Sequence, residues 1–145
     1  MIVIDDRLLL GVVAESSSPI VRPYLDALEQ GQLFTTGSWY GRLARALGDP
    51  GQGALSRTWM GMGETEQRRA SVAMDRLPPR LGLLSLRRLV PVMVALPGRW
   101  NLLTAEAVAT AIVVEATIAV TTESDLLARA AATAGIEVDI VGPAR

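Results

Sequence analysis

Three acidic residues lie at predicted junctions between strands and helices, where carboxylates are available for chemistry. Asp5 follows the apolar, β-branched run Ile2–Ile4. Glu123 comes shortly after the similar run Thr117–Val120, and Glu106 lies in the first turn of an apolar helix. In open α/β sheets, ligands bind at the edge where the carboxyl ends of parallel strands meet. We therefore expect these three acids to lie in one pocket at that edge.

A metal ion would explain such a grouping of acids. Three carboxylates brought together repel one another, and a cation relieves this repulsion. Oxygen ligands without His or Cys favour Mg²⁺ or Mn²⁺, which can activate a water molecule and hold a phosphodiester. Glu106 completes the set only if the loop 97–103 carries it to the same edge. Each acid also has a structural explanation, because Asp often caps helices and the helix dipole favours acids in a first turn.

The composition narrows the possible chemistry further. The 145 residues include no Cys and no His, and all fourteen basic side chains are Arg. Thiolate, imidazole and Schiff-base mechanisms are therefore excluded. The net charge of −1 neither indicates nor excludes a nucleic-acid ligand. The groups that remain available for catalysis are carboxylates, hydroxyls, arginines and any metal ion that these residues bind.

A possible RNA-contacting surface lies on the predicted helix 38–47. Arg42 and Arg45 lie close in sequence to Trp39 and Tyr40, and such a set could contact RNA phosphates and bases. The same pattern is typical of the solvated side of an amphipathic helix whose aromatic residues belong to the core.

The elements that must position these residues alternate between strand-like and helix-like patterns. Apolar residues spaced three or four apart predict helices, and short β-branched or alternating runs predict strands. Gly135, which readily adopts positive φ, is expected to end the last helix. In chain order we expect a strand at Ile2–Ile4, helices within 8–13, 20–30, 38–47 (capped by Ser38) and 64–77, a helix 105–114 capped by Thr104, a strand Thr117–Val120, a helix 126–134 capped by Ser124, and a strand 136–140.

Two middle segments are harder to interpret. The glycine-rich segment 51–63 predicts a long exposed loop, in which Trp59 and Met60 could pack against a neighbour or a second subunit. Residues 83–89 have helical spacing, whereas 90–96 resembles a strand despite Pro91.

This order of elements predicts a three-layer α/β/α fold with a central parallel sheet and helices on both faces, formed by a single domain, residues 1–145. No segment has the eighteen or so consecutive apolar residues of a membrane span. The first six residues carry acids where a signal peptide has a basic region. We therefore expect a cytoplasmic protein that does not interact with membranes.

Four stretches are similar to motifs of one known family, namely Met1-Ile2-Val3-Ile4-Asp5, Ala105-Glu106-Ala107, Ala119-Val120-Thr121-Thr122-Glu123 and Gly135-Ile136-Glu137-Val138. Through these stretches the chain resembles the PIN domain ribonucleases, which include the VapC-type toxins of toxin–antitoxin pairs. This resemblance implies a PIN-like, Rossmann-like topology, with Asp5, Glu106 and Glu123 as catalytic metal ligands. It implies that Thr121 orients the site or a phosphate, that RNA is the substrate, and that an antitoxin protein is a possible partner.

The sequence also departs from the family pattern. The family usually carries a further acid on a helix near the stretch Thr35–Tyr40, which has none here, and two of its usual Asp positions are Glu. The first hypothesis is a Mg²⁺- or Mn²⁺-dependent endoribonuclease that contacts RNA through Thr121 and Arg42, and the toxin of a toxin–antitoxin pair is one form that it could take. The alternative is a catalytically degenerate PIN-like domain that binds protein or RNA, and a homodimer is possible in either case. A Rossmann-like module for a small ligand is disfavoured, because no glycine-rich turn follows the first strand.

Overall fold

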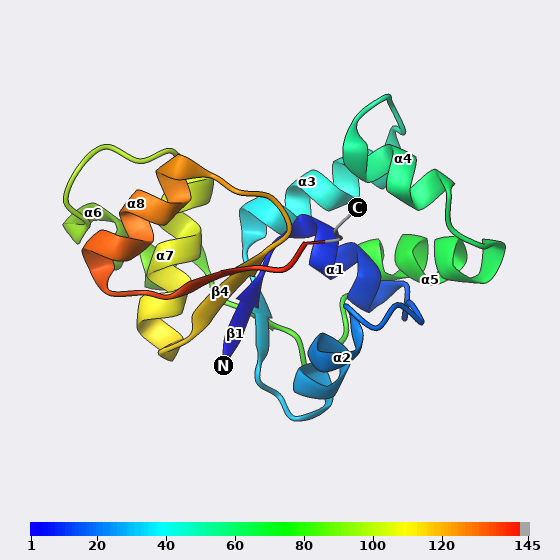
Figure 1. Ribbon diagram of the computed structural model, residues 1–145, viewed down its shortest axis with the longest axis horizontal. Helices are drawn as coiled ribbons and strands as arrows, with labels where there is room; N and C mark the ends of the chain where they lie inside the picture. Colours follow the sequence, from blue (N-terminus) through cyan, green and yellow to red (C-terminus); the bar gives the residue numbers. More distant parts are fainter. Residues whose placement is uncertain (143–145) are drawn as a thin grey trace.

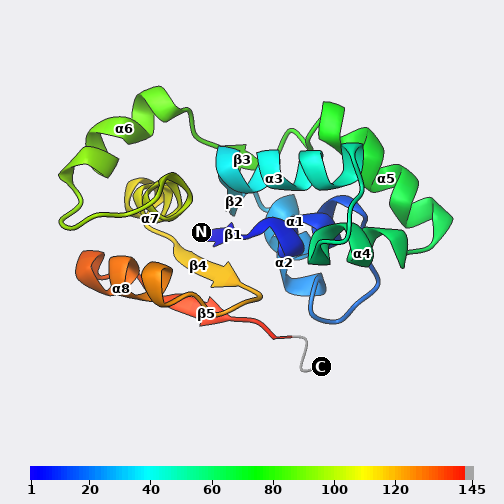
Figure 2. The same ribbon diagram turned by 90° about the horizontal axis from the view of Figure 1, so that it is seen from above.

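The structure is a computed structural model that describes residues 1–142 of the chain. Five parallel strands form one sheet in the order β3-β2-β1-β4-β5. Helices pack on both faces of this sheet, as Figures 1 and 2 show, which confirms the predicted α/β/α fold. The strands are β1 (Ile2–Ile4), β2 (Leu33–Thr35), β3 (Gly82–Leu83), β4 (Thr117–Val120) and β5 (Val138–Ile140).

The helices fall into two groups around the sheet. Helices α1, α2, α3 and α5 contribute to the core on one face, and α7 and α8 form the core on the other. No helix in residues 1–142 is long and apolar enough to cross a bilayer. The helices are α1 (Asp6–Val13), α2 (Arg22–Glu29), α3 (Gly37–Gly48), α4 (Ala54–Met60), α5 (Glu64–Asp75), α6 (Leu86–Ala95), α7 (Leu102–Val114) and α8 (Asp125–Ala134).

The central strand β1 is buried on both faces. Ile4 packs with the α1 and α2 side, whereas Val3 packs with the α7 and α8 side, and neither side chain is exposed. Successive residues of a strand point to opposite faces, so a strand between two helical layers needs apolar residues throughout. This explains why the short run Ile2–Ile4 already predicted a central strand.

The C-terminal unit has the predicted signals at both ends of α8. The hydroxyl of Ser124 accepts a hydrogen bond from the Leu127 amide at 3.2 Å. Gly135 ends the helix with φ of 72°, a conformation that glycine adopts without steric cost. Both predictions are confirmed. They could be made from the sequence because helix caps depend on residues that are close together in the chain.

Several predictions for the middle of the chain are wrong. The predicted loop 51–63 contains helix α4, and the predicted strand 90–96 lies largely in helix α6, which includes Pro91. Ser85 caps α6, and the helix continues through Pro91 although a proline inside a helix removes one amide donor and crowds the preceding turn. Strand β2 was not predicted, because Leu33-Phe34-Thr35 lacks the apolar, β-branched run of β1 and its hydrogen bonds come from β1 and β3, which are distant in sequence.

Two predicted helix caps are also wrong. Helix α3 is capped by Thr36, whose hydroxyl accepts from the Trp39 amide at 3.1 Å, and not by Ser38. Helix α7 is capped by the Asn101 side chain, which accepts from the Thr104 amide at 2.8 Å. Because α7 begins three residues earlier than predicted, Glu106 lies in its second turn and not in its first.

Candidate functional site

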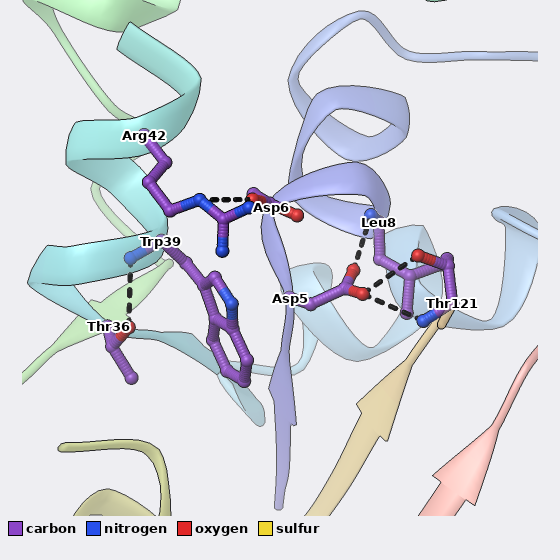
Figure 3. Close-up of polar contacts among 7 residues, drawn as sticks. All are labelled: Asp5, Asp6, Leu8, Thr36, Trp39, Arg42 and Thr121. Carbon is purple, nitrogen blue, oxygen red and sulfur yellow. Dashed lines mark hydrogen bonds and ion pairs between the residues drawn. The ribbon is translucent and has the colours of Figure 1, made fainter. Parts of the chain in front are cut away.

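Asp5 joins the ends of the two central strands. Its Oδ1 accepts from the Leu8 amide at 3.0 Å, which caps α1. Its Oδ2 accepts from both the amide and the hydroxyl of Thr121, at 2.7 and 2.8 Å. Figure 3 shows these three contacts, which tie the start of α1 to the end of β4. Asp5 therefore fixes the connection between β4 and α8 in position.

A cavity of about 540 Å³ opens at this edge of the sheet. It is lined by residues from β1, α1, α3, α4, the start of α7 and the connection from β4 to α8. The structure thus brings Asp5, Thr121, Glu123 and Arg42 to one cavity, with Glu123 and Arg42 exposed to solvent. The polar residues of the lining are Asp5, Asp6, Arg7, Arg42, Ser56, Asn101, Thr104, Thr121, Thr122, Glu123 and Ser124.

The neighbouring carboxylate of Asp6 points in a different direction. Figure 3 shows Asp5 directed toward Thr121 and Asp6 toward Arg42 on α3. The Oδ2 of Asp6 lies 3.4 Å from the Nε of Arg42, but this buried oxygen has no hydrogen-bond partner among residues 1–142. Burial raises the pKa of Asp6 above its ordinary value, and the charge of Asp5 raises it further. Asp6 is thus a buried acid with unused hydrogen-bonding capacity beside the cavity.

Asp6 should make the protein less stable as the pH rises. A raised pKa means that the folded chain binds the proton more tightly than the unfolded chain, so stability is lost as the pH rises from 3.8 through the raised value. Asp6→Asn should remove this dependence and raise the free energy of unfolding at neutral pH by about 1 kcal/mol. Urea unfolding of both proteins at several pH values measures the effect. A difference between them that stays constant with pH would contradict this account.

Glu106 lies outside this cavity. It is only 2% exposed, and its Oε1 and Oε2 accept from the amides of Ser38 and Gly37 at 2.8 and 3.2 Å. Together with Leu83, Leu84, Leu86 and Leu102, these residues line a separate hollow of about 380 Å³. Among residues 1–142, no three acidic side chains lie close enough together to hold a metal ion.

The position of Glu106 follows from the needs of helix α3. The first amides of a helix have no partner within the helix and carry partial positive charge. Thr36 satisfies the Trp39 amide, and the Glu106 carboxylate satisfies those of Gly37 and Ser38. These two hydrogen bonds hold the Glu106 carboxylate at the start of α3, and so keep it away from Asp5.

The aromatic residues near Arg42 belong to the core. Trp39 is 3% exposed and packs with α7 and α8, and the half-buried Tyr40 donates its hydroxyl proton to the Met74 carbonyl. Neither ring is therefore free to stack on a base. Arg42 itself is well exposed at the cavity, so a contact with RNA would depend on its charge.

Several polar residues of the cavity lining were not predicted to belong to the site, among them Asp6, Asn101 and Thr104. An Asn followed by an apolar run is a typical signal for the start of a helix. This signal could have predicted that Asn101 caps α7 and that Thr104 lies near it at the sheet edge. No known family, curated protein or solved structure matches this chain.

Proposed function

We propose that this chain is a PIN-like domain that binds single-stranded RNA at the carboxyl ends of β1 and β4 without cutting it. The observation that argues against RNA cleavage is that both carboxylate oxygens of Glu106 accept hydrogen bonds from amides at the start of α3. The nuclease hypothesis needs Glu106 beside Asp5 and Glu123, but only the latter two line the cavity. The choice of RNA rests on the resemblance.

The cavity offers groups that suit a phosphodiester chain. Arg7 and Arg42 supply positive charge, and Asn101, Thr104 and Thr122 supply neutral donors. Contacts from such side chains to phosphate oxygens position a nucleic acid without reading its bases. The 61% exposed side chain of Arg42 can reach a ligand while its Nε stays near Asp6.

Arg42→Ala should weaken RNA binding about tenfold, because the loss of one charged contact costs about 1.4 kcal/mol. Fluorescence anisotropy with labelled single-stranded RNA, at two salt concentrations, measures the affinity and its salt dependence. The matched control is Arg129→Ala, which removes an exposed arginine of α8 outside the cavity lining. RNA binding that is undetectable in the wild type, or equally weakened by both variants, would refute the proposal.

A second candidate is a Mg²⁺- or Mn²⁺-dependent endoribonuclease, a toxin with an antitoxin partner in the cytoplasm. It is favoured by the Oδ2 of Asp6, which accepts no hydrogen bond from the described part of the chain although it lies near the Arg42 Nε, since Mg²⁺ often binds one or two carboxylates together with substrate phosphates. The ion would bind Asp6, and Asp5 and Glu123 line the same cavity. A bound ion would supply an activated water molecule for phosphodiester hydrolysis.

The two candidates differ in a cleavage assay. The wild type should leave labelled RNA intact in the presence of Mg²⁺ or Mn²⁺, and Asp6→Asn should bind RNA as the wild type does. Cleavage that requires Mn²⁺ and disappears in Asp6→Asn, with RNA binding retained, would establish the nuclease and overturn the non-cutting proposal.

A further inference from the structure

Helix α6 is apolar but largely uncovered. Leu86, Val90 and Val94 are 47%, 45% and 79% exposed, and they follow one another at intervals of four residues. Only Leu89 of this helix is buried. Figure 2 shows α6 at the periphery, packed against α7 on one side only. A stripe of apolar side chains at helical spacing therefore faces outward.

The stripe continues into the hollow above Glu106. The exposed side chains of Leu83 and Leu102 stand at the rim of this hollow, and Leu86 belongs to both the hollow and the helix. We call the surface formed by Leu83, Leu86, Val90, Val94 and Leu102 the α6 face. Exposed apolar patches of this kind are typical of interaction sites.

The α6 face lies in a segment of strongly positive charge. Residues 76–105 contain five arginines and no Asp or Glu, although the whole chain has a net charge of −1. Arg87 and Arg88 are exposed on α6, and none of the ion pairs formed within residues 1–142 includes either of them. The surface thus combines apolar contact area with uncompensated positive charge.

We propose that the α6 face binds an acidic, amphipathic helical segment of another protein. Apolar residues of that segment would lie along the stripe, with one of them in the leucine-lined hollow. Its Asp or Glu residues would face Arg87, which lies beside the stripe on the helix surface, three residues before Val90. A second copy of this chain fits less well. A two-fold symmetric pairing of the α6 faces would bring like-charged arginines together without acids between them.

The test uses synthetic helical peptides that carry leucines at positions i, i+4 and i+7 and glutamates beside them. The full-length protein should bind the acidic peptides, and a set with lysines in place of the glutamates should bind at least tenfold more weakly. Val94→Asp should weaken binding of the acidic set about tenfold. The matched control is Val72→Asp, which changes a 62% exposed valine of α5 and should leave binding unchanged.

Reversal of charge completes the design. The variant Arg87→Glu should lose affinity for the acidic peptides and bind the lysine peptides more tightly than the wild type does, with an unchanged melting temperature. The matched control is Arg88→Glu, on the side of α6 away from the stripe, which should change binding much less. Failure of the acidic peptides to bind, or equal binding of both sets, would overturn the proposal. So would a wild-type dimer in light scattering that Val94→Asp dissociates, or a stronger effect of Val94→Asp on binding to anionic vesicles than to peptides.

Discussion

Glu106→Ala should lower the free energy of unfolding by about 3 kcal/mol, because this buried carboxylate holds the N-terminus of α3. The substitution removes the acceptors of the Ser38 and Gly37 amides, together with the favourable interaction between a carboxylate and the helix dipole. It also leaves a void where the side chain was. Urea denaturation followed by the fluorescence of Trp39 and the other tryptophans measures the change.

Glu106→Gln is the matched control for size. Its amide keeps one oxygen acceptor and most of the volume but loses the charge, so we expect a loss of about 1 to 2 kcal/mol. A loss below about 1 kcal/mol in Glu106→Ala would show that the carboxylate does not support α3. Neither variant should change RNA binding at the cavity, whereas a catalytic or metal-binding Glu106 would require a change in Mn²⁺ binding as well.

Asp5→Ala should cost about 3 kcal/mol of stability and release the connection between β4 and α8. Alanine cannot cap α1, and the amide and hydroxyl of Thr121 lose their acceptor. Asp5→Asn should cost about half as much, because asparagine is a good helix cap but offers one acceptor oxygen and not two. Thermal unfolding gives the stabilities, and hydrogen exchange should show faster exchange at the Leu8 and Thr121 amides.

A double-mutant cycle separates the two halves of this interaction. Thr121→Val removes the hydroxyl donor but keeps the amide, so Asp5→Asn and Thr121→Val should together cost less than the sum of their single effects. Additive effects would show that the Thr121 hydroxyl does not contribute to the interaction with Asp5.

The amino-acid sequence alone determined the elements whose signals are local. The β-branched runs of β1 and β4 indicated buried strands, and Ser124 and Gly135 marked the two ends of α8, because caps and turns depend on residues only a few positions apart. The alternation of strands and helices then predicted a parallel sheet, which placed Asp5 and Glu123 at one edge.

Tertiary structure decided the features that depend on partners distant in sequence. Strand β2 is a strand because β1 and β3 lie beside it, and α6 is a helix in a segment whose apolar run also suited a strand. The position of Glu106 illustrates the physical reason most clearly. Because α7 begins at Leu102, Glu106 lies in its second turn and its carboxylate points toward α3. The first amides of α3, nearly seventy residues earlier in the sequence, have no partner within their own helix and stabilise the carboxylate in this position.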